Sequence, residues 1–164
     1  MTKKLAVVMD HISTIKPYKD STFAMLLEAQ TRGYELHHVT MDQLAFSDNQ
    51  AIALNQKLTV TDNLDDWFQL EAVTTTPLTD FDVILMRKDP PFDMEYIYAT
   101  YLLEHAQQQG TVIVNHPQSL RDANEKMYTT WFPECCPPLL ISRQASQIKA
   151  FLEQYKDTVI KPLG

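Results

Sequence analysis

Two adjacent cations, Arg87 and Lys88, follow an apolar run that has the length of a buried strand. The next residues, Asp89-Pro90-Pro91, stiffen the turn because proline fixes its own backbone and lacks an N–H donor. A rigidly held arginine at a strand end can bind a carboxylate through two parallel hydrogen bonds. Arg87 is therefore a candidate substrate-binding residue. The simpler alternative is a surface arginine paired with Asp89 or Asp93, an arrangement that contributes little to stability.

Two lysines could bind a second kind of group. Lys161 ends an apolar run, so its stem can pack while its ammonium reaches into a cleft. Lys126 follows Asn124-Glu125 in a segment with a helical pattern. Lysines so placed can hold nucleotide phosphates as point charges. The alternative for each is an ordinary solvated side chain.

Other chemistry has little support in the sequence. The chain has 3 glycines in 164 residues, and they are far apart, so it holds no complete glycine-rich phosphate loop. Cys135 and Cys136 are adjacent and cannot easily bridge, which argues against a redox or zinc site. His37 and His38 are neighbours in a predicted strand and point to opposite faces, a poor geometry for a metal.

The elements that must position these residues form a doubly wound α/β domain over roughly the first 120 residues. Polar residues that alternate weakly with apolar ones within 41–76 predict short antiparallel strands or a hairpin. In such sheets, ligands bind beyond the carboxyl ends of the strands, where the strand order reverses. The predicted elements are strands at 5–9, 34–40, 83–86 and 111–114, a helix from the cap Asp20 to Gly33, and a helix from the cap Asp93 to Gly110.

The pattern changes after residue 115. A strand–helix–strand unit of this size buries too little surface to stand alone, so the chain is expected to end inside a second domain. Its predicted elements are helices at 118–131 and 148–155 and strands at 139–141 and 158–162.

Composition limits the possible partners. A content of 45% apolar and 21% charged residues is typical of a globular protein, and the net charge of -7 argues against a nucleic-acid-binding surface. The sequence has no apolar stretch long enough to cross a membrane, and its first apolar run is too short for a signal peptide. We therefore expect a cytoplasmic protein that binds neither nucleic acid nor membrane.

Six strings spread over the chain can be compared with known families. They are DSTFAMLLEAQ (20–30), VILMRKDPPFD (83–93), IYATY (97–101), PQSLRD (117–122), NEK (124–126) and IKPL (160–163). A set of strings in the same order is far more specific than a single short motif. Together these strings resemble the bacterial (prokaryotic-type) glutathione synthetases.

The resemblance implies an ATP-grasp ligase that joins γ-glutamylcysteine to glycine with ATP and Mg2+, through an acyl phosphate on the cysteinyl carboxylate. It implies a Rossmann-like pre-ATP-grasp domain at 1–123 and the beginning of an ATP-grasp domain at 124–164. It also implies a homo-oligomer.

Position by position, the resemblance implies that Lys126 and Lys161 bind the nucleotide phosphates and that Arg87 lies on the substrate side. Asp10 lies in a loop where the family commonly has Met-Asp-Pro, but His11 stands in place of that proline. The metal ligands are expected beyond Gly164. The chain is therefore expected to be an N-terminal fragment, natural or shortened, that is inactive alone.

Two alternatives come from other classes of protein. One is a non-catalytic α/β module that binds a small anion or a partner, or that mediates oligomerisation. The other is a receiver domain, which would need an acidic pair at the end of the first strand, where the sequence offers only Asp10.

Overall fold

The computed structural model describes residues 2–163, which divide into two compact units between Arg121 and Asp122. The first unit is built on a seven-stranded sheet, in which six strands follow the order β3-β4-β2-β1-β6-β7 and the seventh, β5, also pairs with β4. The strands β1, β2, β6 and β7 are parallel, whereas β3, β4 and β5 pair in antiparallel fashion. The elements are β1 (Lys4–Val8), α1 (Ser21–Thr31), β2 (Glu35–Val39), β3 (Leu44–Ser47), β4 (Gln50–Val60), β5 (Phe68–Pro77), β6 (Val83–Met86), α2 (Met94–Gln108), β7 (Val112–Val114) and α3 (Pro117–Asp122).

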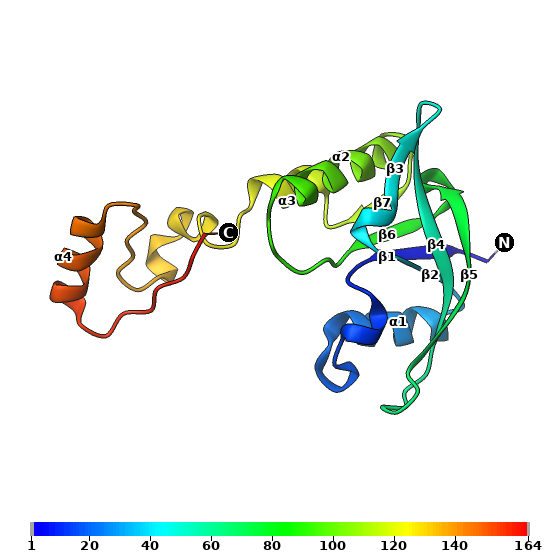
Figure 1. Cartoon of the computed structure of the whole chain (residues 1–164), viewed down its shortest axis with the longest axis horizontal. Helices are drawn as coiled ribbons and strands as arrows, with labels where there is room; N and C mark the ends of the chain where they lie inside the picture. The colour runs from blue at the N-terminus through cyan, green and yellow to red at the C-terminus, as the bar shows by residue number, and fades with distance from the viewer. Residues whose placement is uncertain (1, 164) are drawn as a thin grey trace. The chain divides into compact units, whose positions relative to one another are not determined.

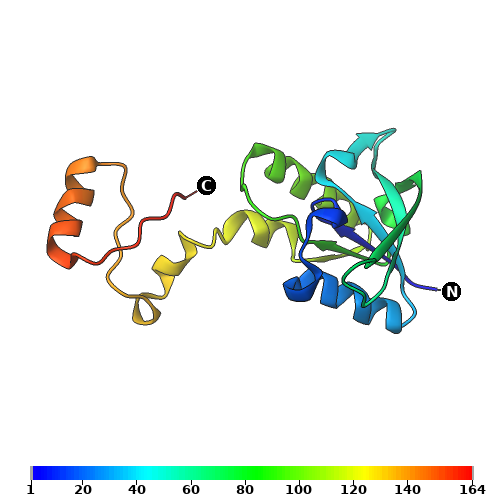
Figure 2. The ribbon, with the colours of Figure 1, turned by 60° about the horizontal axis from the view of Figure 1, so that its bottom comes forward.

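The core of this unit has two layers because successive side chains of a strand point to opposite faces of the sheet. On one face, Ala6 of β1 belongs to the same apolar cluster as Leu103 of α2. On the other face, Val7 belongs to a cluster with Phe23 and Leu26 of α1. Helices α1 and α2 lie on opposite sides of the sheet (Figures 1 and 2). The predicted α/β class, with a doubly wound and mostly parallel sheet, is confirmed. The domain boundary predicted between 123 and 124 stays a prediction, because a compact unit need not fold separately.

The predicted ends of both helices are confirmed. The carboxylates of Asp20 and Asp93 accept hydrogen bonds from backbone amides three residues later, at 2.8 and 3.0 Å. Gly33 and Gly110 follow the helices with φ of 82° and 107°, a conformation that side chains with a Cβ rarely adopt. None of the helices in residues 2–163 has the length and apolarity needed to cross a bilayer.

The antiparallel strands are longer than the short strands predicted within 41–76. Strand β4 alone spans eleven residues and pairs with β5 along most of its length. Asn55 interrupts the apolar alternation of β4, yet it is 0% exposed. Its amide donates to the carbonyl of Thr74 at 3.1 Å and to the hydroxyl of Thr76 at 2.8 Å. These bonds satisfy a polar side chain inside the sheet, which periodicity alone cannot anticipate.

The helix predicted at 118–131 is confirmed only over 118–122, and its continuation in the second unit is wrong. Helix α3 ends at Asp122, and a 3-10 turn covers Tyr128–Trp131. Between them, Asn124 Oδ1 accepts from the backbone amides two and three residues later, both at 3.1 Å. This side chain competes with the helical hydrogen bonds and starts a new turn.

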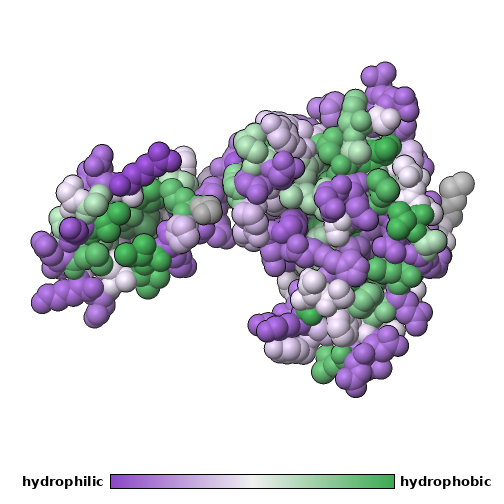
Figure 3. Space-filling model, in the orientation of Figure 1, coloured by the Kyte–Doolittle hydropathy of each residue, from purple (hydrophilic) through white to green (hydrophobic). Residues whose placement is uncertain are grey.

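The strands predicted at 139–141 and 158–162 are also wrong, whereas the predicted second helix is present as α4 (Ala145–Tyr155). Within residues 2–163 neither segment pairs with a neighbouring strand, and strands are stabilised by such pairing. Large apolar side chains of this unit are exposed, including Trp131 at 65% and Val159 at 81%. Figure 3 shows apolar side chains on the visible face of this unit.

His38 is a buried imidazole beneath the loop that follows β1. It is 1% exposed, and its Nε2 lies 3.3 Å from the backbone oxygen of Asp10. Burial lowers the pKa of His38, the hydrogen bond to Asp10 opposes this shift, and the charge of His11 adds to it. His38 is therefore a buried, structural group.

We expect His38 to make the fold less stable in mild acid. The unfolded side chain binds a proton near pH 6.5, whereas the folded one binds it only at lower pH. The free energy of unfolding should therefore decrease as the pH falls below about 6.5. Urea unfolding at pH 7.5 and 5.5 measures this free energy. Its change between the two pH values should be smaller in His38→Gln than in His116→Gln, the control at an exposed histidine. An equal pH dependence in both variants would contradict the assignment.

Leu103 is 0% exposed and fills the layer between α2 and the sheet. Leu103→Ala should lower the free energy of unfolding by about 2–5 kcal/mol, because it leaves a cavity. Met94→Ala, at a 57% exposed position of the same helix, is the control and should change it little. Urea unfolding measures the free energy of unfolding of both variants. A similar decrease in the two would refute this account of the core.

Candidate functional site

The candidate site lies at the carboxyl ends of β1 and β6, which are neighbouring parallel strands. The chain leaves β1 toward α1 on one face and β6 toward α2 on the other, so the strand order reverses between these two strands. The hydrogen bonding between β1 and β6 continues one residue further, because the backbone amide of Arg87 donates to the carbonyl of Val8 at 2.8 Å. Two segments far apart in the sequence, 10–20 and 87–93, therefore start from the same edge of the sheet.

Arg87 is held by the first turn of α1. Its Nε donates to the hydroxyl of Thr22, and its Nη2 donates to the hydroxyl of Ser21, each at 3.0 Å. Burial raises the pKa of Tyr96, and the charge of Arg87 partly offsets this rise, so the phenol lies within electrostatic range of the guanidinium. The two hydroxyls are functional candidates that sequence reasoning missed. The available signal was a pair of hydroxyl residues at the start of the helix that follows β1.

The alternative pairing of Arg87 with Asp89 or Asp93 is not what the structure shows. Among the described residues, Arg87 forms no ion pair with either carboxylate, and Asp93 instead caps α2. Lys88 is the cation that is neutralised here: its Nζ lies 3.1 Å from Asp10 Oδ1. Its side chain is 17% exposed, and its Nζ also donates to the carbonyl of Asp89 at 2.7 Å. This ion pair ties the loop after β1 to the loop after β6.

A hollow of about 330 Å³ adjoins these loops, within the size range of small-ligand sites. Its lining carries both signs of charge, which suits a zwitterionic ligand better than a simple anion. The lining residues are Asp10, Thr14, Ile15, Lys16, Lys19, Asp20 and Asp89.

A larger hollow of about 450 Å³ lies at the opposite edge of the sheet. Its lining includes Lys3, residues 79–83 and residues 109–112, which surround the amino ends of β1, β6 and β7. Ligands of open α/β sheets bind at the carboxyl ends of the strands. We therefore place the candidate site at the carboxyl ends of β1 and β6, beside the smaller hollow, which is lined by Asp20 and Asp89 but not by Arg87.

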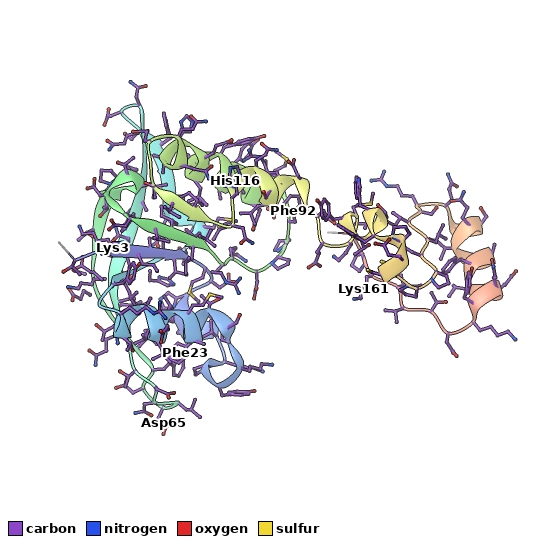
Figure 4. The ribbon with its side chains drawn as sticks, turned by 180° about the vertical axis from the view of Figure 1, so that it is seen from behind. Lys3, Phe23, Asp65, Phe92, His116 and Lys161 are labelled. Carbon is purple, nitrogen blue, oxygen red and sulfur yellow. The ribbon has the colours of Figure 1, made fainter. Side chains whose placement is uncertain are left out.

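The two candidate lysines belong to the second unit. The Nζ of Lys126 lies 3.8 Å from Glu125 Oε1, and its side chain is 30% exposed. Lys161 is exposed and lies in the irregular segment after α4 (Figure 4), so the packed stem expected at a strand end is absent. Their common role in binding nucleotide phosphates stays a prediction. The same residues contain no cluster of three or more histidines, cysteines, aspartates or glutamates that could hold a metal ion.

Comparison with known proteins covers both units. Residues 3–121 match the family model "Prokaryotic glutathione synthetase, N-terminal domain", and residues 125–164 match "Prokaryotic glutathione synthetase, ATP-grasp domain". Glutathione synthetase of Escherichia coli strain K12 is 54% identical over 160 residues, those of Salmonella typhi 53% and Vibrio parahaemolyticus 51%. Each alignment covers 98% of this chain and 51% of the relative, so the chain spans about half the length of the curated relatives it matches. The chain belongs to the prokaryotic glutathione synthetase family.

Proposed function

We propose that this chain supplies the first half of a glutathione synthetase, which joins γ-glutamylcysteine to glycine with ATP and Mg2+. The observation that carries the proposal is the match to both family models in order, over nearly the whole chain. The arrangement at the carboxyl ends of β1 and β6 supports it, because an arginine there has hydroxyl partners and no carboxylate partner among the described residues.

In this proposal, Arg87 binds a carboxylate of γ-glutamylcysteine. A guanidinium and a carboxylate can form two parallel hydrogen bonds, which fix orientation as well as position. The mixed charges of the adjoining hollow suit a peptide that carries both ammonium and carboxylate groups. Such binding would contribute to catalysis because it holds the dipeptide, and with it the carboxylate that reacts, in place.

Lys126 and Lys161 would contact the phosphates of ATP, the co-substrate that activates the carboxylate. Lysine suits this role because its ammonium is a compact point charge. Among residues 2–163, no group of three or more histidines, cysteines, aspartates or glutamates is placed to hold a metal ion. The homo-oligomer implied by the family resemblance and the cytoplasmic location expected from the sequence stay predictions.

The chain alone should form no glutathione, because it spans only 51% of the length of the relatives that it matches. A chimera can be made by joining this chain, after Leu163, to the part of the Escherichia coli K12 relative that lies beyond the matched region. This chimera should form glutathione. Glutathione formation, measured with and without ATP, tests both proteins. Activity of the chain alone would refute the first expectation, and a folded but inactive chimera would count against the proposed function.

Within that chimera, Arg87→Ala should raise the KM for γ-glutamylcysteine roughly 10- to 100-fold, the effect of losing hydrogen bonds to a charged group. The KM for ATP should stay nearly unchanged. Arg32→Ala is the matched control, because Arg32 lies at the end of α1 and pairs with Glu28 on the surface. Steady-state kinetics with each substrate varied in turn gives the answer. An unchanged KM for the dipeptide in Arg87→Ala would remove this residue from the site.

For Lys126 and Lys161 we expect the reverse of the Arg87 result, with a change in the KM for ATP and not in the KM for the dipeptide. Lys126→Ala and Lys161→Ala in the chimera should raise the KM for ATP and leave the KM for γ-glutamylcysteine close to its original value. Lys149→Ala, on α4, is the control for loss of a lysine from the same unit. An ATP KM that is the same in all three variants would show that neither lysine contacts the nucleotide.

A further inference from the structure

Arg87 uses only one edge of its guanidinium for contacts within the protein. The Nε–H and one N–H of Nη2 lie along the same edge, and these donate to Thr22 and Ser21 at 3.0 Å. In residues 2–163 the structure gives no hydrogen bond from Nη1. The end of the guanidinium, formed by Nη1 and the remaining N–H of Nη2, therefore keeps a pair of parallel donors. This pair matches the two oxygens of a carboxylate.

The hydroxyls that hold the inner edge are themselves fixed. Thr22 is 5% exposed, and it lies between the capping residue Asp20 and the core residue Phe23. The Asp20 carboxylate accepts from the amide of Phe23 at 2.8 Å, which closes the first turn of α1 around Thr22. The backbone of Arg87 is fixed separately by its bond to the carbonyl of Val8 at 2.8 Å. Both ends of the arginine side chain are thus attached to regular elements.

The choice of partner also preserves the positive charge of Arg87. Arg32 and Arg121 each pair with a glutamate at 2.7 Å, so a carboxylate offsets their charge within the protein. Hydroxyls orient a guanidinium without neutralising it. The first turn of α1 carries no acidic side chain, and the one carboxylate at its cap is bonded to the Phe23 amide. The adjacent helix N-terminus carries a partial positive charge of its own, which favours an anion at this position.

We propose that Thr22 and Ser21 are positioning residues, whose hydroxyls hold Arg87 so that its free end binds a carboxylate of γ-glutamylcysteine. This inference rests on the proposed function and adds the residues that set the geometry of the substrate-side arginine. Removing a hydroxyl should let the guanidinium rotate, so that the dipeptide loses affinity although Arg87 is still present.

The first test uses the 164-residue chain and observes Arg87 directly by NMR. The Nε–H of Arg87, assigned by its loss in Arg87→Lys, should exchange with water roughly fivefold faster in Thr22→Val, because it loses its hydrogen-bond acceptor. Valine matches threonine in shape, and Thr22→Ser keeps the hydroxyl, so Thr22→Ser should restore slow exchange. Exchange that is equally fast in the original protein and in Thr22→Val would overturn the proposal.

The second test measures kinetics in the active chimera. Thr22→Val and Ser21→Ala should raise the KM for γ-glutamylcysteine roughly fivefold and leave the KM for ATP unchanged, and Thr22→Ser should stay near the original value. Ser21 is exposed, so Ser21→Ala tests the proposal even if Thr22→Val fails to fold. A normal dipeptide KM in Ser21→Ala and Thr22→Val, with a raised KM in Arg87→Ala, would overturn the positioning role and leave the proposed function intact. An unchanged KM in Arg87→Ala would overturn both.

Discussion

The pairing of β1 with β6 is the constraint on which the site depends. These two strands lie side by side in the sheet, yet 78 residues separate the ion-paired Asp10 and Lys88 that follow them. Their alignment continues through the bond from the Arg87 amide to the Val8 carbonyl. The fully buried β1 fixes this edge, because it is packed against α1 through one set of side chains and against α2 through the other. A shift in this register by one residue would exchange the side chains that pack in the two layers of the core, so the packing of the core helps to specify where Arg87 lies.

Local chemistry then adds the polar details to this frame. Asp10 and Lys88 join the loops after β1 and β6 through an ion pair. The buried His38 contacts the backbone oxygen of Asp10 and so supports the loop after β1. The first turn of α1 brings Ser21 and Thr22 to Arg87. Each of these contacts joins residues that are distant in sequence, and each depends on the strand order at the centre of the sheet. The same edge therefore combines a rigid scaffold with a cation whose charge is not neutralised inside the protein.

The parts of this structure that the sequence predicted are those governed by short-range rules. The buried strand β1, the caps Asp20 and Asp93 and the glycines that end both helices follow from period and capping chemistry. The length of β4 could not be predicted, because Asn55 is buried through bonds to a strand nineteen or more residues away. The strands expected in the second unit were wrong because a short apolar run forms a strand only where a partner strand pairs with it. For the candidate site, residue type and position made Arg87 a candidate, whereas its contacts with Ser21 and Thr22 come from long-range packing that no local pattern encodes.

The central claim is that the dipeptide substrate binds at the carboxyl edge of β1 and β6 through Arg87. The most direct measurement is a titration of the 15N-labelled chain with γ-glutamylcysteine, followed by amide and arginine side-chain NMR signals. The account predicts that shifts concentrate in residues 10–22 and 87–89 and include the side chain of Arg87. Shifts that concentrate instead around residues 79–83 and 109–112, at the opposite edge of the sheet, would contradict it.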